Sequence, residues 1–151
     1  SRMRCNFYAT NPASLIAYFL SPVVYDSFVP LNTFTELPDT IRSYFGIKID
    51  KGDFFVAVKQ AGGQEKLTPI EFKFKGKIFT DTVVLEIKHQ INTTDLLLNN
   101  ELIGTFTTEM TGDEGEDATN NTFLPLLAPV KSADGVEVNL TIENYQFIQD
   151  R

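Results

Sequence analysis

Residues 83–91 read Val-Val-Leu-Glu-Ile-Lys-His-Gln-Ile, and their two-residue periodicity indicates the class of fold. Apolar side chains at positions 83, 85, 87 and 91 alternate with polar side chains at positions 86, 88 and 90. Successive side chains of a strand point to opposite faces of its sheet. The stretch is therefore predicted to be a strand with one buried face, and His89 falls on the apolar side.

The same periodicity appears near the end of the chain. Apolar residues alternate with polar ones from Val136 to Ile142, and Tyr145 and Phe147 then continue in the opposite phase. A shift by one residue turns every later side chain to the other face of a sheet. We therefore expect a strand with a β-bulge near residues 143–144.

Further strands are predicted on both sides of these two. Residues 54–59 form a strand, and the glycines of residues 61–64 supply a hairpin turn. Residues 67–75 return as an edge strand, because Pro69 cannot donate a ladder hydrogen bond. The remaining predictions are a strand at 102–110, an irregularly paired extended segment at 123–130 and a turn at 132–135.

Two segments in the first third of the chain have less regular patterns. Residues 38–45 begin with Pro-Asp, end before Gly46 and place Ile41, Tyr44 and Phe45 at helical spacing, so one short helix is predicted there. The apolar run of residues 13–20 fits either a strand or a core helix, and the sequence leaves this choice open.

Together these elements predict one mainly β domain over residues 1–151, an antiparallel β-sandwich of the jelly-roll type or a small barrel. The chain holds 13 Phe and 5 Tyr, and each buried aromatic removes about 150–250 Å² from water, which is enough to anchor a core.

The net charge of −7 is concentrated in the second half of the chain. Such acidity repels phosphate, so nucleic acid is not an expected partner. No apolar run reaches the roughly 20 residues of a spanning helix, so no membrane span is expected either.

Common catalytic and cofactor sites lack their residues. His89 is the single histidine and Cys5 the single cysteine, and Cys5 is interpreted as a small buried hydrophobe. These two cannot supply a zinc site in its usual forms, and no phosphate-binding glycine motif is present. No catalytic residue and no cofactor are therefore predicted, and an enzyme built on carboxylates remains a minor alternative.

One acidic loop and one aromatic set are candidate sites. Residues 111–121 concentrate carboxylates that could bind calcium, although a solvated or partner-facing loop is the favoured interpretation. The carboxylates are Asp113, Glu114, Glu116 and Asp117. Aromatic residues crowd the first third of the chain and could form an interface if they are not core residues. The interaction candidates are Tyr8, Tyr18, Phe19, Tyr25 and Phe28.

The function predicted from these observations is that of a non-enzymatic structural or interaction domain. Loops and edge strands would face a protein partner, which could be a second copy of the chain. An extracellular, cell-surface or virion assembly is the favoured setting. The alternative is a small barrel that binds an apolar ligand in an aromatic-lined cavity.

Overall fold

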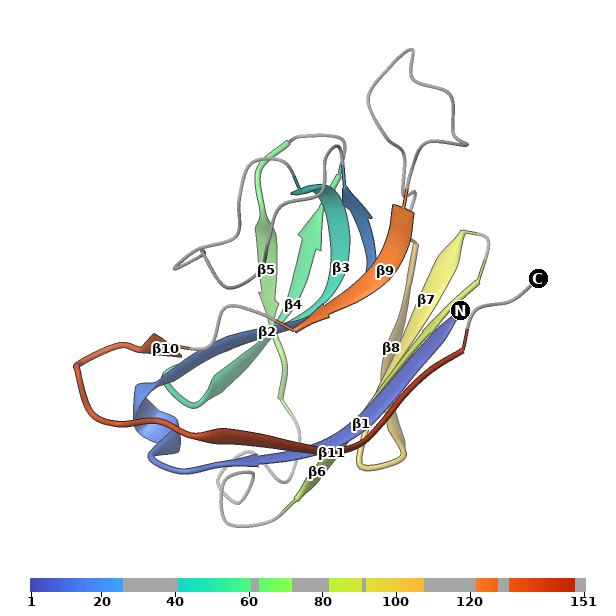
Figure 1. Ribbon diagram of the computed structural model, residues 1–151. Coiled ribbons are helices and arrows are strands. Elements are labelled where there is room, and N and C mark those ends of the chain that lie inside the picture. Colours follow the sequence, from blue (N-terminus) through green and yellow to red (C-terminus); the bar gives the residue numbers. More distant parts are fainter. Residues whose placement is uncertain are drawn as a thin grey trace.

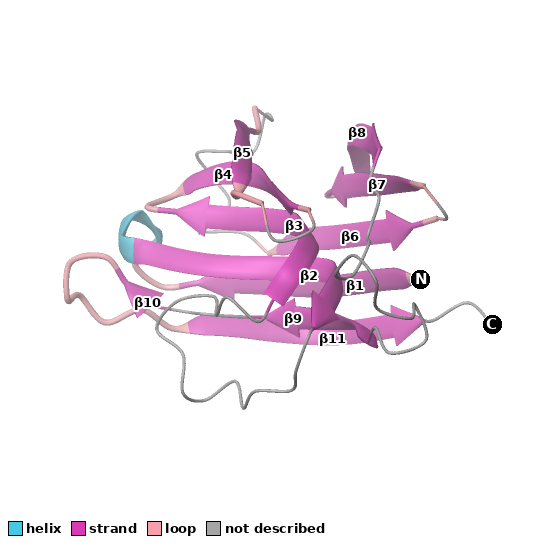
Figure 2. Cartoon of the chain, turned by 90° about the horizontal axis from the view of Figure 1, so that it is seen from above, coloured by secondary structure: helices cyan, strands magenta, loops and turns pink. Residues whose placement is uncertain are grey.

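The chain folds into two antiparallel β-sheets packed face to face, which confirms the predicted β-sandwich (Figure 1). The structure is a computed structural model. It describes residues 1–25, 41–60, 63–71, 82–90, 92–107, 122–127 and 131–148. Figure 2 shows the long strands of both layers running along a common line, which is the aligned manner of sheet packing.

Among the described residues, the first sheet has five strands, and we call it sheet A. In spatial order its strands are β11 (Leu140–Ile148), β1 (Arg2–Ala9), β6 (Val83–His89), β7 (Thr93–Leu98) and β8 (Glu101–Thr107). The predicted strands at 83–91 and 102–110 are thus present over their described parts. Strands β1 and β7 were not predicted from the sequence.

The second sheet, sheet B, has six described strands. Five follow the order β10 (Lys131–Ser132), β2 (Leu15–Tyr25), β3 (Ile41–Asp50), β4 (Asp53–Lys59) and β5 (Lys66–Pro69), and β9 (Thr122–Leu127) also pairs with β2. The open choice at residues 13–20 is settled, because a 3₁₀ turn at Pro12–Ser14 leads directly into β2.

The core lies between the sheets and is rich in aromatic rings. Phe7 of β1 stacks on Phe19 of β2 with ring centroids 4.5 Å apart, and Phe54 of β4 lies 6.4 Å from Phe7. All three side chains are at most 1% exposed. The inward positions of β1, β3, β6 and β7 complete this core. Stacked rings contribute beyond their buried area, so this cluster holds the two layers together.

Two hairpins of the sandwich use tight two-residue turns. Lys51 and Gly52 join β3 to β4 with φ values of 52° and 87°, and Asn99 and Asn100 join β7 to β8 with 51° and 64°. Positive φ at both central residues is the mark of a type I′ turn, whose twist matches that of the strands. Asn-Asn is thus a hairpin signal that the sequence analysis overlooked.

The predicted bulge near residues 143–144 is confirmed. Arg4 of β1 pairs with Gln146 of β11, whereas Asn6 pairs with Glu143, so β11 holds one extra residue at this point. Asn144 has a φ of 52°, a left-handed conformation that asparagine tolerates better than most residues. The extra residue is the reason that apolar positions change phase along β11.

The predicted helix at 38–45 is wrong over its described part, because residues 41–45 belong to β3. Phe45 faces the core between the sheets, while Ile41 and Tyr44 are buried in a second apolar cluster with Leu20 and Ala57. A strand that is buried on both faces shows no alternation, and here its apolar residues imitated helical spacing. Residues 38–40 lie outside the described residues.

Other boundaries also differ from the sequence prediction. The last long strand begins at Leu140, and residues 136–139 ahead of it are irregular. There the Asp134 carboxylate accepts a hydrogen bond from the Val136 amide, which ties the chain into a local turn. The barrel alternative is not observed in the described part of the chain, whose strands form two separate sheets.

Candidate functional site

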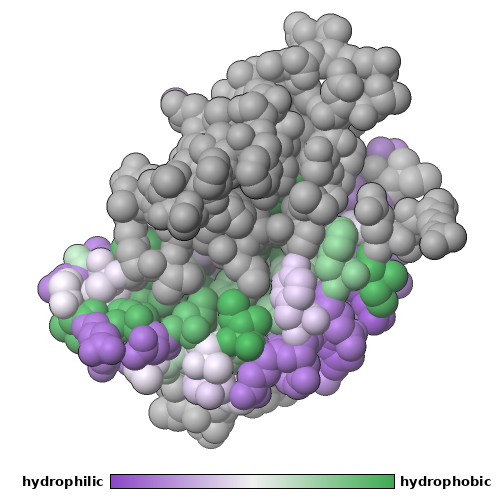
Figure 3. All heavy atoms as spheres, in the orientation of Figure 1, coloured by the Kyte–Doolittle hydropathy of each residue, from purple (hydrophilic) through white to green (hydrophobic). Residues whose placement is uncertain are grey.

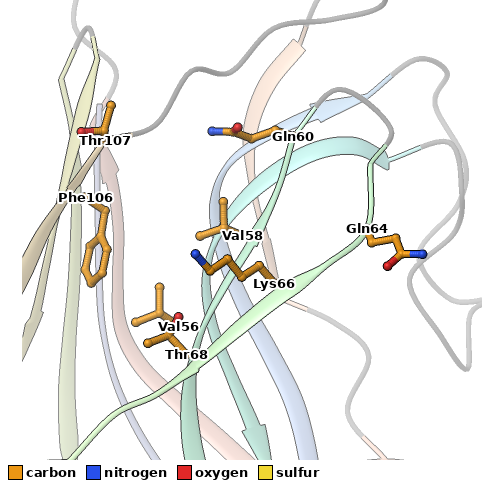
Figure 4. A pocket seen from close by; sticks show the side chains of 8 residues that line it. All are labelled: Val56, Val58, Gln60, Gln64, Lys66, Thr68, Phe106 and Thr107. Carbon is orange, nitrogen blue, oxygen red and sulfur yellow. The ribbon is translucent and has the colours of Figure 1, made fainter.

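A groove opens where the edge strands β5 and β8 face each other across the sandwich (Figure 4). Its volume is about 410 Å³. Apolar and uncharged polar side chains share its lining with one lysine. The described lining residues are Val56, Val58, Gln60, Gln64, Lys66, Thr68, Phe106 and Thr107.

Strands β4 and β5 form one wall and the floor of the groove. Val56 pairs with Thr68, and Val58 pairs with Lys66, so these four side chains share the inward face of sheet B. Val56 is 3% exposed, whereas Lys66 and Thr68 are exposed. Apolar valines thus form the floor. Polar side chains of β5 occupy inward positions at which apolar side chains would pack the two sheets together.

Strand β8 forms the opposite wall. Phe106 projects toward the groove and packs against Phe45, with ring centroids 5.4 Å apart. Its neighbour on the inward face is Gly104, where an added Cβ would lie 3.0 Å from the Phe106 ring. The absence of a side chain at Gly104 therefore leaves room for this ring beside the groove.

The main-chain edge of β8 completes the wall. Within the described part of the chain, β8 pairs with β7 alone, so its other edge presents backbone groups without a strand partner. An extra residue near Ile103 interrupts the pairing with β7, and residues 104–107 then continue in regular register. Unpaired backbone groups at a sheet edge are a template for another strand.

The chemistry of the groove suits binding. Its described lining contains no carboxylate, histidine or cysteine, and the Lys66 ammonium is its single charged group. General acid–base catalysis needs a positioned proton donor or acceptor, and those lining residues offer no such pair. Among the described residues, three apolar and five polar side chains line the groove, so it can bury an apolar group and also hydrogen-bond a ligand.

A polar cluster on the outer face of sheet B fixes the start of β5. The Tyr18 hydroxyl donates to both oxygens of Glu65 at 3.1 and 3.0 Å, and the Tyr44 hydroxyl donates to the same carboxylate. The Lys48 ammonium lies 5.3 Å from the centre of the Tyr18 ring. Burial, and then the hydrogen bond and charge of Glu65, raise the pKa of Tyr44. Because its phenol stays protonated, this cluster anchors the residue that precedes Lys66.

The aromatic interaction candidates whose side chains are described, Tyr8, Tyr18 and Phe19, do not come together. Tyr8 is 38% exposed on the outer face of sheet A, Tyr18 belongs to the cluster with Glu65, and Phe19 is fully buried in the core. Tyr25 ends β2, but its side chain is outside the described residues, as is the whole of Phe28. Phe19 is thus a core residue, which was the other possibility for these aromatic residues besides an interface.

The other candidate residues lie apart from the groove. Cys5 is fully buried, and burial raises the pKa of its thiol to about 12, in agreement with a core role. The His89 ring bonds the Thr94 hydroxyl through Nδ1 at 2.8 Å. Burial, and then the positive chain amino group, lower the pKa of His89.

Calcium binding at residues 111–121 remains a prediction, because Asp113, Glu114, Glu116 and Asp117 lie outside the described residues. Among the residues with a described position, no group of three or more His, Cys, Asp or Glu side chains could hold a metal ion. In that same part of the chain, no helix has the length and apolarity to cross a membrane.

Sequence reasoning missed the groove, although a signal for it exists. In the predicted strand at 67–75, Ile70, Phe72 and Phe74 fall on one apolar face, and counting back by two from Ile70 reaches Thr68 and Lys66. Positions 66, 68 and 70 lie on the same face of the strand. Because two successive positions of that face are polar, the strand end at Lys66 is indicated to face solvent and not the core. The partner wall could not be found in this way, because it depends on the packing of β8.

Comparisons of the sequence identify no relative. No protein-family model matches the chain, and no curated protein matches it.

Comparison of the structure finds other β-sandwiches. The binding domain of botulinum neurotoxin serotype D/C matches with a TM-score of 0.55 and 13% identity, over 95% of this chain and 31% of that chain. A botulinum neurotoxin type C structure, described by its dependence on two ganglioside molecules for cell entry, matches with a TM-score of 0.54 and 12% identity over the same shares.

The Bacillus licheniformis β-glucanase has a TM-score of 0.54 and 14% identity, over 95% of this chain and 63% of that chain. The present chain thus spans about a third of the toxin structures and under two thirds of the glucanase. At these identities the likeness concerns the fold alone, and it places the chain among two-layered antiparallel β-sandwiches.

Proposed function

We propose that this chain is a non-enzymatic binding domain whose groove between β5 and β8 accepts an extended segment of a protein partner. The observation that carries the proposal is the main-chain edge of β8 at residues 104–107, which faces no second strand among the described residues and lies beside an apolar floor. An added strand would bond to that edge, and every second side chain would enter the groove.

The edges of the two sheets differ in how well they are protected against strand addition. Strand β5 has only four residues and contains Lys66 and Pro69, while β11 contains the bulge at Asn144. Lysine, proline and bulges are the usual protections of an edge. Strand β8 also has a bulge, at Ile103, but its residues 104–107 include no lysine or proline, pair with β7 in regular register and reach the groove at Phe106 and Thr107.

The lining defines the chemistry of the segment. Val56, Val58 and Phe106 favour an apolar side chain, and burial of such a side chain contributes about 1.5–3 kcal/mol. The Lys66 ammonium at the rim favours a carboxylate in the same segment. A groove at the sheet edges is open to a continuing polypeptide, which favours a segment of protein over a small apolar ligand.

The setting and the structural neighbours are compatible with this role. An extracellular, cell-surface or virion setting is part of the proposal, because small β domains serve as building blocks in such assemblies. The toxin structures belong to a binding domain and to a protein that interacts with gangliosides, which supports a binding role for this fold. The β-glucanase is an enzyme on the same fold, so the fold does not support a non-enzymatic role, and support for that part of the proposal comes from the groove lining.

The test is selection of random twelve-residue peptides displayed on phage against the purified chain. We expect selected peptides to alternate apolar and polar residues and to contain Asp or Glu. Lys66→Glu should weaken the best peptide about tenfold or more, because a like charge then meets its carboxylate. Lys88→Glu makes the same charge change on the outer face of sheet A, and it should leave binding unchanged.

Three results would contradict the proposal. They are the failure to enrich any alternating peptide, equal binding by Lys66→Glu and the parent chain, and equal weakening by Lys88→Glu. Light scattering adds a separate readout. If a second copy occupies the groove, the dimer should dissociate in Lys66→Glu and persist in Lys88→Glu.

A further inference from the structure

We infer that the outer face of sheet A carries a second binding site, for a neutral saccharide, where β1 pairs with β11. A depression of about 220 Å³ lies on this pair and is lined by Arg4, Asn6, Asn144 and Gln146. Figure 3 shows hydrophilic residues gathered along the lower right of the molecule, where Figure 1 places these strands.

The pairing of the two strands gathers the four side chains. Arg4 lies opposite Gln146 and Asn6 opposite Glu143, so residues from both strands share the outer face. The bulge inserts Asn144 between these two pairs in a left-handed conformation, with a φ of 52°. Bulges re-aim side chains near functional sites, and this bulge adds a third amide to the depression.

None of the four side chains uses its hydrogen-bonding groups internally, as far as the described residues extend. Elsewhere on the same face, polar groups pair across strands. Thr105 donates to Asp95 at 2.6 Å, and the Arg2 guanidinium lies 3.9 Å from Glu86. An ordinary solvated sheet face would be expected to show such pairs here as well.

The donor and acceptor set points to vicinal hydroxyl groups. Each amide offers two donors and one acceptor oxygen, and a guanidinium offers donors in a planar fork. Planar groups of this kind can bond two adjacent hydroxyls at once. A hydroxyl both donates and accepts, so a saccharide can satisfy the mixed set, whereas an anion would leave the amide oxygens without donors.

The charges around the depression favour a neutral ligand. Arg4 pairs across strands with Glu86 of β6 as well as with Gln146, and Glu143 lies opposite Asn6. The two carboxylates offset the guanidinium, which weakens attraction for anions. Tyr8 lies two residues beyond Asn6 on the same face and is 38% exposed. Its ring offers an apolar surface for the C–H groups of a sugar ring.

The test is titration of the isotope-labelled chain with lactose, cellobiose and maltose, each at millimolar concentrations, followed by amide NMR. We expect at least one disaccharide to shift the amides around Arg4, Asn6, Asn144 and Gln146. Gln146→Ala should weaken that binding by about two- to tenfold, as expected for the loss of one or two hydrogen bonds. Gln64→Ala removes the same group from the groove and should change nothing.

The inference is overturned if none of the three sugars shifts this face, if the shifts map elsewhere, or if Gln146→Ala binds as well as the parent chain. Because Gln146 is exposed, its variant should unfold at the parent temperature, which is checked by circular dichroism. The Lys66→Glu variant should bind the sugar normally. The two sites can therefore fail independently.

Discussion

The two sides of the sandwich are built from the same kind of paired strands, but they differ in how deeply their inward side chains are buried. Where β1 lies over β2, the inward residues Met3, Cys5 and Phe7 are at most 1% exposed, and Phe7 stacks on Phe19. Where β5 approaches β8, the inward residues Lys66 and Thr68 are exposed beside a groove. We call these the closed side and the open side.

The difference shows what keeps two sheets together. Strands pair through backbone hydrogen bonds on both sides, with a bulge in β11 on one side and in β8 on the other, so the hydrogen-bond ladders alone do not bring the layers into contact. Contact follows from the side chains that meet between the layers, since burial of apolar area is the main favourable contribution to folding. Polar inward residues on one short strand are sufficient to leave a groove.

The largest effect on stability is expected from removing a ring on the closed side. Phe19→Ala should lower the free energy of unfolding by roughly 3–5 kcal/mol, the usual loss for a buried phenylalanine. Phe106→Ala, the matched change on the open side, should cause a smaller loss because Phe106 is only partly buried. Urea denaturation measures both, and equal losses would remove the distinction between the sides.

A somewhat smaller loss is expected from adding a methyl group between β2 and β3. A Cβ on Gly46 would lie 2.0 Å from the Phe19 carbonyl oxygen and 2.8 Å from the Leu20 Cα, so the backbones must separate. Gly46→Ala should therefore lower the free energy of unfolding by about 3 kcal/mol, the upper part of the range for overpacking. Gly63→Ala is the milder comparison and should cause a smaller loss, because Gly63 is exposed and its added Cβ would lie 3.1 Å from the Gln60 carbonyl oxygen, a tight contact that a shift of a few tenths of an ångström relieves.

A pH-dependent loss is expected from His89, whose partner Thr94 lies opposite Phe106 of the open side. The pKa of His89 is lowered from 6.5 in the folded chain, so the unfolded chain takes up a proton first as the pH falls. Stability should therefore decrease below pH 6.5, until the folded pKa is reached. His89→Gln should show a weaker dependence in this window by thermal unfolding, and an identical dependence would contradict the assignment.

The smallest effect leaves stability unchanged and compares thiol reactivity on the two sides. Cys5 is buried with a pKa of about 12, so little thiolate exists at pH 8. It should react with Ellman's reagent on the order of a thousandfold more slowly than the added cysteine of Thr107→Cys on the open side. Fast labelling of Cys5 in the folded parent chain would show that the closed side opens readily.

The sequence predicted the class of fold from its half-buried strands. Alternation around Val83 and the phase change after Ile142 identified a sandwich strand and a bulge that the structure confirms. The helix at 38–45 failed because β3 is covered on both faces, which removes the alternation. Periodicity reports burial on one face, so it cannot identify strands that lack an exposed face.

The sites were less predictable than the fold. The groove and the depression both arise between strands that are far apart in sequence, such as β1 and β11. A signal for Lys66 existed in the two polar residues that continue the row of Ile70, but no pattern distinguishes Gln146 from other surface residues. Of the features of the two sites, the bulge at Asn144 was predicted from the sequence. That prediction marked an irregular position, but it did not show which residues surround it.

The position of β1 between β6 and β11 has a consequence for folding. Met3 pairs with Phe147 on one side and with Ile87 on the other. Both contacts of β1 therefore join residues that are far apart in the sequence. Topologies of such high contact order fold slowly, typically in milliseconds to seconds. During synthesis on the ribosome, β1 emerges before the other described strands yet gains its last neighbour only when β11 is complete.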